Sequence, residues 1–313
     1  MKTPARIAFM IIAVSFAASA YSGEKSWESL NSQFLKSYTQ EQYPEAAESA
    51  KSALKAAEET FGPDHLNVAT SLDNLALVYA AQGKYAEADP LYKRALAIRE
   101  KALGTDHPDV MKSLDNLAVL YRTEGKYAEA EPLFKKVLTA KEKALGGNHA
   151  EVMKSLDNLA ALYRTEGKYA EAEPLFKSIL AKKERVLGPE HPDVVASMNN
   201  LAKIYYSEGK YAEAEPLYKR ALAIREKALG PEHPDVVASI SNLAKIYYSE
   251  GKYAEAESFY KKALAVLEKA LGPDHPDVAA ILENMAVLYK KMGNQDEAKK
   301  LEVRAKEVHS KKQ

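Results

Sequence analysis

Hydrophobic and polar positions follow a helical period along nearly the whole chain, in stretches of about 16 to 18 residues. In one stretch, apolar residues at i, i+3, i+4 and i+7 form a single stripe of Leu114, Leu117, Ala118 and Tyr121. After a break at 124–126, a second stripe contains Ala130, Phe134, Val137 and Leu138. The pattern predicts two antiparallel helices joined by a short turn. We expect Ala118 and Ala130 at the closest approach of the helices, because a larger side chain would force them apart.

The two-helix pattern repeats every 42 residues without an insertion. The repeat is marked by His65, His107, His149, His191, His233 and His275, and by Gly83, Gly125, Gly167, Gly209, Gly251 and Gly293. Since each unit has an apolar face that only a neighbour can cover, this period predicts a solenoid. The expected fold is all-α, a right-handed superhelical solenoid of about seven antiparallel helix pairs. Residues 21–64 form a degenerate opening pair, and residues 65–313 form six units that end in a polar capping helix.

The joints between units read Gly188–Pro189–Glu190–His191–Pro192. Glycine suits a left-handed turn after a helix, and proline suits the first turn of the next. Prolines also occur inside the second helices, where we expect a tolerated bend and not a helix end: Pro90, Pro132, Pro174 and Pro216. One histidine per joint places these rings about 20 Å apart, too far to share a metal ion. We therefore expect the histidines to cap helices and pack the joints.

The first twenty residues are typical of a secretory signal peptide. Lys2 and Arg6 precede an apolar run over 7–17, and small residues at 18–20 suit cleavage after Ala20. An uncleaved anchor and a buried helix are the alternatives. Because no second long apolar run follows, no membrane span is expected in the mature chain. The expected location is the periplasm or the exterior.

Composition excludes several classes of function. The 313 residues carry equal numbers of basic and acidic side chains, and residues 21–313 have two more acids than bases, so nucleic acid is not an expected partner. There is no cysteine, which excludes disulfides, thiolate metal sites and cysteine nucleophiles. The acids recur with the repeat and no phosphate-binding or hydrolase motif occurs, so we expect no enzyme and no cofactor or metal.

The pattern Leu-x2-Leu-Ala-x2-Tyr, followed by Ala-x3-Phe or Ala-x3-Tyr, resembles the tetratricopeptide repeat (TPR) signature over residues 66–308 and more weakly over 24–61. The 42-residue period and the stretches 200–205 and 229–234 resemble the kinesin-light-chain type of this repeat. Kinesin light chains also have a coiled coil that binds the motor. No such heptad run occurs here, so the motor function is not expected.

The resemblance implies a peptide-binding groove lined by the first helices. In that family an Asn before the Leu-Ala pair bonds the backbone of an extended peptide, a task that suits an amide because it both donates and accepts. The matching residues are Asn74, Asn116, Asn158, Asn200, Asn242 and Asn284. The alternative is that these residues support packing between adjacent first helices.

Further groove residues are expected on the same side of the first helices, in two zones. The first is mixed in charge and contains Lys112, Asp115 and Arg122 in one unit and Lys154, Asp157 and Arg164 in the next. The second contains Lys203, Tyr206, Lys245 and Tyr248. We hypothesise that the second zone favours a peptide with acidic and aromatic side chains. The alternative is a solvated helix face with incidental charges.

The leading hypothesis is therefore an exported, monomeric scaffold that holds a protein or peptide partner in the groove. A second hypothesis is an architectural component that assembles through its ends or coats an envelope structure without a peptide ligand. An enzyme would require unique residues outside the repeat, and only 21–40 and the tail after Val308 are free of it.

Overall fold

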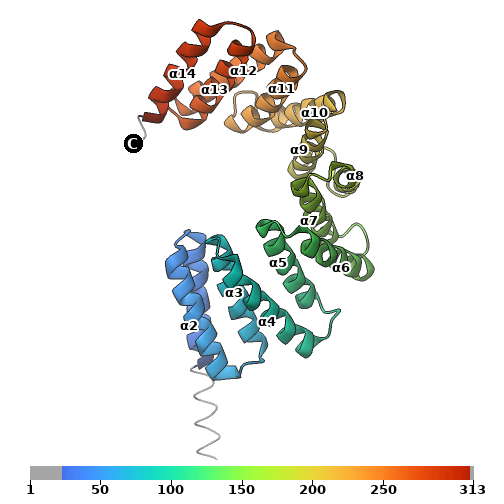
Figure 1. Cartoon of the computed structure of the whole chain (residues 1–313). Helices are drawn as coiled ribbons and strands as arrows, with labels where there is room; N and C mark the ends of the chain where they lie inside the picture. The colour runs from blue at the N-terminus through green and yellow to red at the C-terminus, as the bar shows by residue number, and fades with distance from the viewer. Residues whose placement is uncertain (1–22, 311–313) are drawn as a thin grey trace, which may run out of the picture. The chain divides into compact units, whose positions relative to one another are not determined.

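The computed structural model describes residues 23–310, which form helices joined by short turns (Figure 1). A first helix covers residues 23–39. It is followed by α2 (Tyr43–Phe61), α3 (Leu66–Ala81), α4 (Tyr85–Leu103), α5 (Pro108–Glu124), α6 (Tyr127–Leu145), α7 (Ala150–Glu166), α8 (Tyr169–Leu187), α9 (Pro192–Ser207), α10 (Tyr211–Leu229), the 3₁₀ turn η1 (Pro234–Val236), α11 (Val237–Ser249), α12 (Tyr253–Leu271), α13 (Pro276–Lys291) and α14 (Gln295–Ser310). The predicted all-α solenoid of helix pairs is confirmed. The expected signal peptide, residues 1–20, lies outside the described residues.

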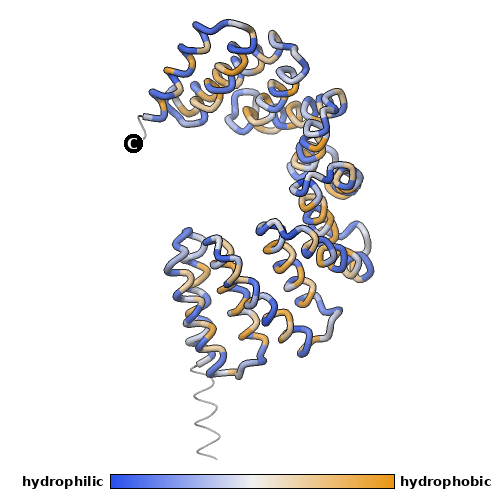
Figure 2. Tube along the Cα trace, viewed as in Figure 1, coloured by the Kyte–Doolittle hydropathy of each residue, from blue (hydrophilic) through white to orange (hydrophobic). Residues whose placement is uncertain are grey.

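The chain divides into two compact bodies, and the boundary between Leu162 and Tyr163 falls within α7. Each helix from α2 to α6 packs on the next in the first body, and each from α8 to α14 does so in the second. Hydrophobic and hydrophilic segments alternate along each helix (Figure 2). The apolar stripes that the sequence predicts are therefore the surfaces on which neighbouring helices pack.

Each helix pair from α3–α4 to α11–α12 has a core of small residues and one large buried ring, whereas the last pair has Glu302 at the position of the ring. Fully buried alanines occur on the first helices at Ala76, Ala118, Ala160, Ala202 and Ala244, and on the second helices at Ala88, Ala130, Ala172, Ala214, Ala256 and Ala298. The buried ring on the second helix is Tyr92, Phe134, Phe176, Tyr218 or Tyr260. This arrangement agrees with the expectation that alanine allows close approach of the two backbones.

The glycines that end the second helices adopt a conformation other than the left-handed helical turn we expected. Gly104, Gly146, Gly188, Gly230 and Gly272 have φ between 78° and 88° and ψ between 152° and 159°. This region is essentially restricted to glycine, because a Cβ would clash with the residue's own backbone. The left-handed helical value occurs instead at Gly125, with φ 83° and ψ 8°, between the two helices of a unit. Two positions of the repeat thus require glycine for different backbone conformations.

The joint histidines cap the first helices. In each case Nδ1 accepts a hydrogen bond from the backbone N–H two residues later, at 3.1 to 3.3 Å. The predicted capping role is confirmed, and the ring nitrogen takes the place of the usual Ser, Thr or Asp oxygen. The prolines inside the second helices do not end them, since α4, α6, α8 and α10 continue through these residues.

Successive units are tied together by a tyrosine hydroxyl. Tyr121 donates to Asp89 at 3.0 Å, and the equivalent tyrosines Tyr205, Tyr247 and Tyr289 donate to Glu173, Glu215 and Glu257 at 3.4, 2.8 and 2.6 Å. Lysines bond the same acids, and hydrogen bonds from Lys177 and Lys210 lower the pKa of Glu173 to about 2. In the last unit the position of the acid is occupied by Lys299, so the row of acceptors ends there.

The opening helix covers the exposed side of the first regular unit. Trp27 Nε1 donates to Ser71 Oγ at 2.8 Å, and its ring packs edge-on against Phe61 with 5.9 Å between centroids. Phe34 is buried among α2 and α3 residues. This degenerate pair therefore supplies the neighbour that α3 and α4 need at the start of the array.

Candidate peptide-binding groove

The predicted asparagines are half-buried on one side of the first helices, which we call the groove face. Asn74 donates from Nδ2 to Asn31 Oδ1 at 2.9 Å, so the N-terminal helix occupies its amide. Within residues 23–310, the side chains of the other five (Asn116, Asn158, Asn200, Asn242 and Asn284) make no hydrogen bond. The predicted row therefore contains one amide that is used internally and five whose donors and acceptors remain available.

Two hollows lie on the groove face of the first body. One, of about 360 Å³, contains Asp73, Asn74, Arg99, Lys112 and Asn116 in its wall. The other, of about 610 Å³, is lined by Lys112, Asn116, Lys154 and Asn158 among other residues. Because they share Lys112 and Asn116, the hollows adjoin and bring together five residues that the sequence singled out.

Two predicted residues of the first zone lie elsewhere. The guanidinium of Arg122, on the last turn of α5, lies 5.9 Å from the Phe134 ring centroid and lines neither hollow. Arg164, near the end of α7, lies beyond the boundary between the two bodies. These side chains belong to the turn between the helices of a unit and not to the hollows.

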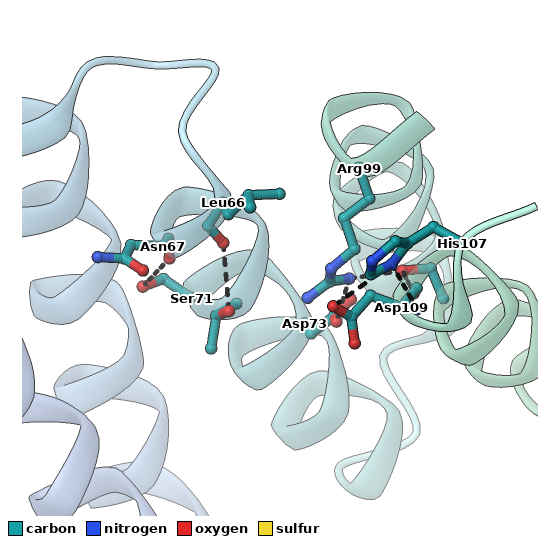
Figure 3. Close-up of polar contacts among 9 residues, drawn as sticks. Leu66, Asn67, Ser71, Asp73, Arg99, His107 and Asp109 are labelled. Carbon is teal, nitrogen blue, oxygen red and sulfur yellow. Dashed lines mark hydrogen bonds and ion pairs between the residues drawn. The ribbon is translucent and has the colours of Figure 1, made fainter. Parts of the chain in front are cut away.

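A row of acid–base pairs forms part of the groove floor, and sequence reasoning missed its basic members. Arg99 Nη1 donates to Asp73 Oδ2 at 2.6 Å (Figure 3). It also donates to Ser113 Oγ at 2.5 Å. The side chains of Arg99 and Asp73 are only 10% and 12% exposed. Burial raises the pKa of the Asp73 carboxyl above its ordinary value, although the guanidinium beside it acts in the opposite direction.

The same pairing recurs one unit later, where Lys141 Nζ lies 3.0 Å from Asp115 and 3.3 Å from Glu151. In both pairs the base follows the acid by 26 residues, from the second helix to the first of the same unit. This spacing is the signal that could have found them, because it recurs at a fixed place in the repeat.

The second body presents tyrosines on the groove face. The Tyr206 ring lies 5.5 Å from Tyr211, and the Tyr248 ring 5.9 Å from Tyr253. The hydroxyl of Tyr206 is 3.0 Å from Ser249 Oγ of the next unit. Beneath them, burial raises the pKa of Tyr218 and of Tyr260 to about 12. The predicted tyrosines are therefore part of an aromatic layer that continues from one unit to the next.

The cations of the second body separate into two classes. Within the described chain, Lys203 and Lys245 have no carboxylate at ion-pair distance, and the same holds for Arg225. Every other Lys and Arg between residues 200 and 275 has one: Lys210, Lys219, Arg220, Lys227, Lys252, Lys261, Lys262 and Lys269. Between residues 200 and 275, the cations without an ion pair are thus Lys203 and Lys245 on first helices and Arg225 on a second helix.

A larger hollow of about 700 Å³ lies between α9 and α13 of the second body. Its wall includes Val195, Ile224, Arg225, Leu267 and Asn284. Of the predicted groove residues only Asn284 lines it, whereas Asn200, Asn242 and the Lys and Tyr of the second zone lie outside its wall. Sequence reasoning did not single out Arg225, because the charged position at which it occurs is shared by most units.

In the described part of the chain, no helix is both long and apolar enough to pass through a lipid bilayer. The architecture defines a repeat protein of stacked helix pairs, with hollows in each of its two bodies. Comparison with known proteins agrees. The sequence profile described as tetratricopeptide repeat matches residues 37–101, 73–143, 109–185, 151–227, 195–269 and 235–311. The chain belongs to the tetratricopeptide repeat family.

Solved structures place it near the kinesin-light-chain type of repeat. A Podosopora anserina structure described as kinesin light chain nearly identical TPR-like repeats is 32% identical, with a TM-score of 0.61, over 66% of this chain and 98% of that one. BtubC (BKLC) from P. vanneervenii is 23% identical, with a TM-score of 0.59, over 78% of this chain and 92% of that one, which is a likeness of fold alone. Aspartyl phosphate phosphatase F from Bacillus subtilis is 16% identical, with a TM-score of 0.61, over 99% of this chain and 77% of that one. This is a likeness of fold alone. Among curated proteins, none matches the sequence.

Proposed function

We propose that this protein is a non-enzymatic scaffold that binds an extended, acidic peptide segment of a partner protein on the groove face. The observation that carries the proposal is the combination of amides and cations whose hydrogen-bonding groups are not used internally. The amides of Asn200 and Asn242 have no internal partner, and the ammonium groups of Lys203 and Lys245 follow them on the same helices. A peptide backbone can pair with the amides, and carboxylates can pair with the lysines.

Aromatic side chains of the peptide have a surface to pack on beside these lysines. Tyr206 and Tyr248 offer ring faces at the same end of their helices, and ring pairs contribute beyond simple area burial. Each hydrogen bond contributes only about 0.5 to 1.5 kcal/mol net, so several must act together to offset the ordering of a flexible peptide. We therefore expect modest affinity for a short peptide.

A peptide panel tests the charge preference. Peptides with acidic and aromatic residues are expected to bind the mature protein more tightly than versions in which each acid is replaced by Lys, and the difference should shrink as salt is added. Fluorescence anisotropy at two ionic strengths measures both effects. The matched control is the variant with Lys203→Gln and Lys245→Gln. It should bind the acidic and the Lys-substituted peptides with similar affinity. Equal binding of the acidic and Lys-substituted peptides to the native protein would contradict the proposal.

We further propose that the protein is exported to the periplasm or the exterior after cleavage behind Ala20. The support is the sequence of residues 1–20, with its two charges, its apolar run and its small residues. Expression of the full chain followed by fractionation and mass spectrometry tests this. A mature chain that begins at Tyr21 outside the cytoplasm is expected, and an intact N-terminus in the cytoplasmic fraction would refute export.

A further inference from the structure

The groove floor contains the same three-residue arrangement in both bodies, with one difference. In the first body Arg99 bonds both Asp73 Oδ2 and Ser113 Oγ, at 2.6 and 2.5 Å. In the second body Arg225 bonds Ser239 Oγ at 2.7 Å, in the same register of the repeat. The residue in the place of Asp73 is Asn199, which cannot supply a negative charge.

The side-chain oxygen of Asn199 does not accept a hydrogen bond from Arg225 either. Its side chain is 8% exposed, and its Oδ1 atom is buried without a hydrogen-bond partner in the described chain. Arg225 forms no ion pair within residues 23–310. The guanidinium therefore retains its charge and several donors, and a buried polar atom lies in the place where a carboxylate would pair with it.

The neighbouring unit loses the charged pair altogether. Ser241 and Leu267 occupy the two places that Asp73 and Arg99 fill, and both line the hollow of about 700 Å³ together with Arg225. Val195, Ile224 and Ile281 add to its apolar wall. The interruption of the acid–base row thus leaves an apolar hollow with one unpaired cation at its side.

The rim of the hollow carries acids. Glu190 is paired with Lys227 at 2.6 Å, whereas Asp235 and Asp277 are mostly exposed and lie 3.7 and 3.6 Å from Nδ1 of their capping histidines. These negative groups disfavour a second carboxylate at the rim. The charge distribution therefore fits a ligand with one carboxylate at Arg225 and no run of acids across the hollow.

We propose that Arg225 binds a single carboxylate of the partner peptide, in the role that Asp73 has for Arg99, and that the adjoining hollow takes a large apolar side chain of the same peptide. The inference rests on the proposed function, and it adds a residue and a ligand pattern to it. Asn199 is the residue that leaves this site open, since an aspartate there would satisfy the arginine internally. Leu267 adds apolar surface to the hollow, and Ser241 places no charge there, so the hollow can bury the apolar side chain.

The substitution Asn199→Asp tests the site, because it introduces the acid that the first body already contains. The probe is a short, end-capped peptide with one Asp and one Leu near each other in a Ser- and Thr-rich sequence, compared with versions in which Asn replaces Asp or Ala replaces Leu. Affinity is measured by titration of the mature chain labelled with ¹⁵N-arginine, so that the Arg225 Nε–H signal reports contact. Arg225→Leu, which copies Leu267, is the second variant.

The native protein is expected to bind the Asp- and Leu-containing probe about tenfold or more tightly than either altered probe, with a shift of the Arg225 signal. Asn199→Asp and Arg225→Leu should both remove the preference for Asp, while circular dichroism and melting temperature show that Asn199→Asp is folded. Equal affinity of native and Asn199→Asp proteins for the probe would overturn the inference and leave the acidic-peptide proposal standing. Failure of the native protein to bind any peptide, in this panel or the acidic one, would overturn both.

Discussion

Replacing Phe134 by alanine is expected to lower the free energy of unfolding by about 3 to 5 kcal/mol. The ring is completely buried on α6, and each regular unit except the last has one buried ring at this position. Removal of the ring loses its transfer free energy and leaves a cavity that close-packed helices fill only in part. Urea unfolding followed by far-ultraviolet circular dichroism measures the change.

The repeat itself supplies the control for this substitution. Tyrosine occupies the same position at Tyr92, Tyr218 and Tyr260 and is buried there. Phe134→Tyr should therefore cost much less than Phe134→Ala, because the repeat accommodates a tyrosine at this position and Tyr92 lines a hollow on the groove face. Equal costs for the two variants would mean that the ring of Phe134 does not fill the core.

Replacing Asp73 by alanine is expected to cost a similar amount, about 3 to 5 kcal/mol, for an electrostatic reason. The change leaves the guanidinium of Arg99, whose side chain is 10% exposed in the native protein, with only Ser113 as a partner. A buried charge without a counterion loses its hydration without compensation. The pair as a whole is expected to stabilise the fold little, because the cost of removing both charges from water offsets much of their attraction.

A later unit of the repeat again provides the matched comparison. The double variant Asp73→Ser with Arg99→Leu reproduces Ser241 and Leu267, and it should be more stable than Asp73→Ala alone. Chemical denaturation of the two single variants and the double variant gives the coupling free energy. A double variant as unstable as Asp73→Ala would show that the cost comes from altered packing and not from the unpaired charge.

The repeat architecture could be predicted from sequence because its signals are local and recur six times. The period of 42 residues, the apolar stripes and the alanine positions all specify the same helix pairs, so agreement across units removes the ambiguity of any one helix. The joint glycines show the limit of local reasoning. Glycine indicates positive φ, but ψ depends on how the following His107 or His191 caps the next helix.

The residue types of the groove could be predicted from the sequence, but the hydrogen bonds and ion pairs that these residues make within the protein could not. The helical pattern places Asn74 and Asn116 on one face, yet only the opening helix reveals that Asn31 occupies the amide of Asn74. Arg99 and Lys141 lie on second helices, far in sequence from the acids that they meet. Because ionic contacts between helices depend on the crossing geometry, periodicity alone cannot assign them.

Affinity for an acidic peptide, measured on the native protein and on a variant with Asn158→Ala, Asn200→Ala and Asn242→Ala, tests the central claim most directly. The three amides have no internal partner, so their removal should weaken binding at least about tenfold without loss of helicity. Asn74→Ala is the matched control, because that amide is already bonded to Asn31 and its loss should leave affinity unchanged. Equal affinity of the triple variant and the native protein would place the interaction on another surface and assign the asparagine row to packing.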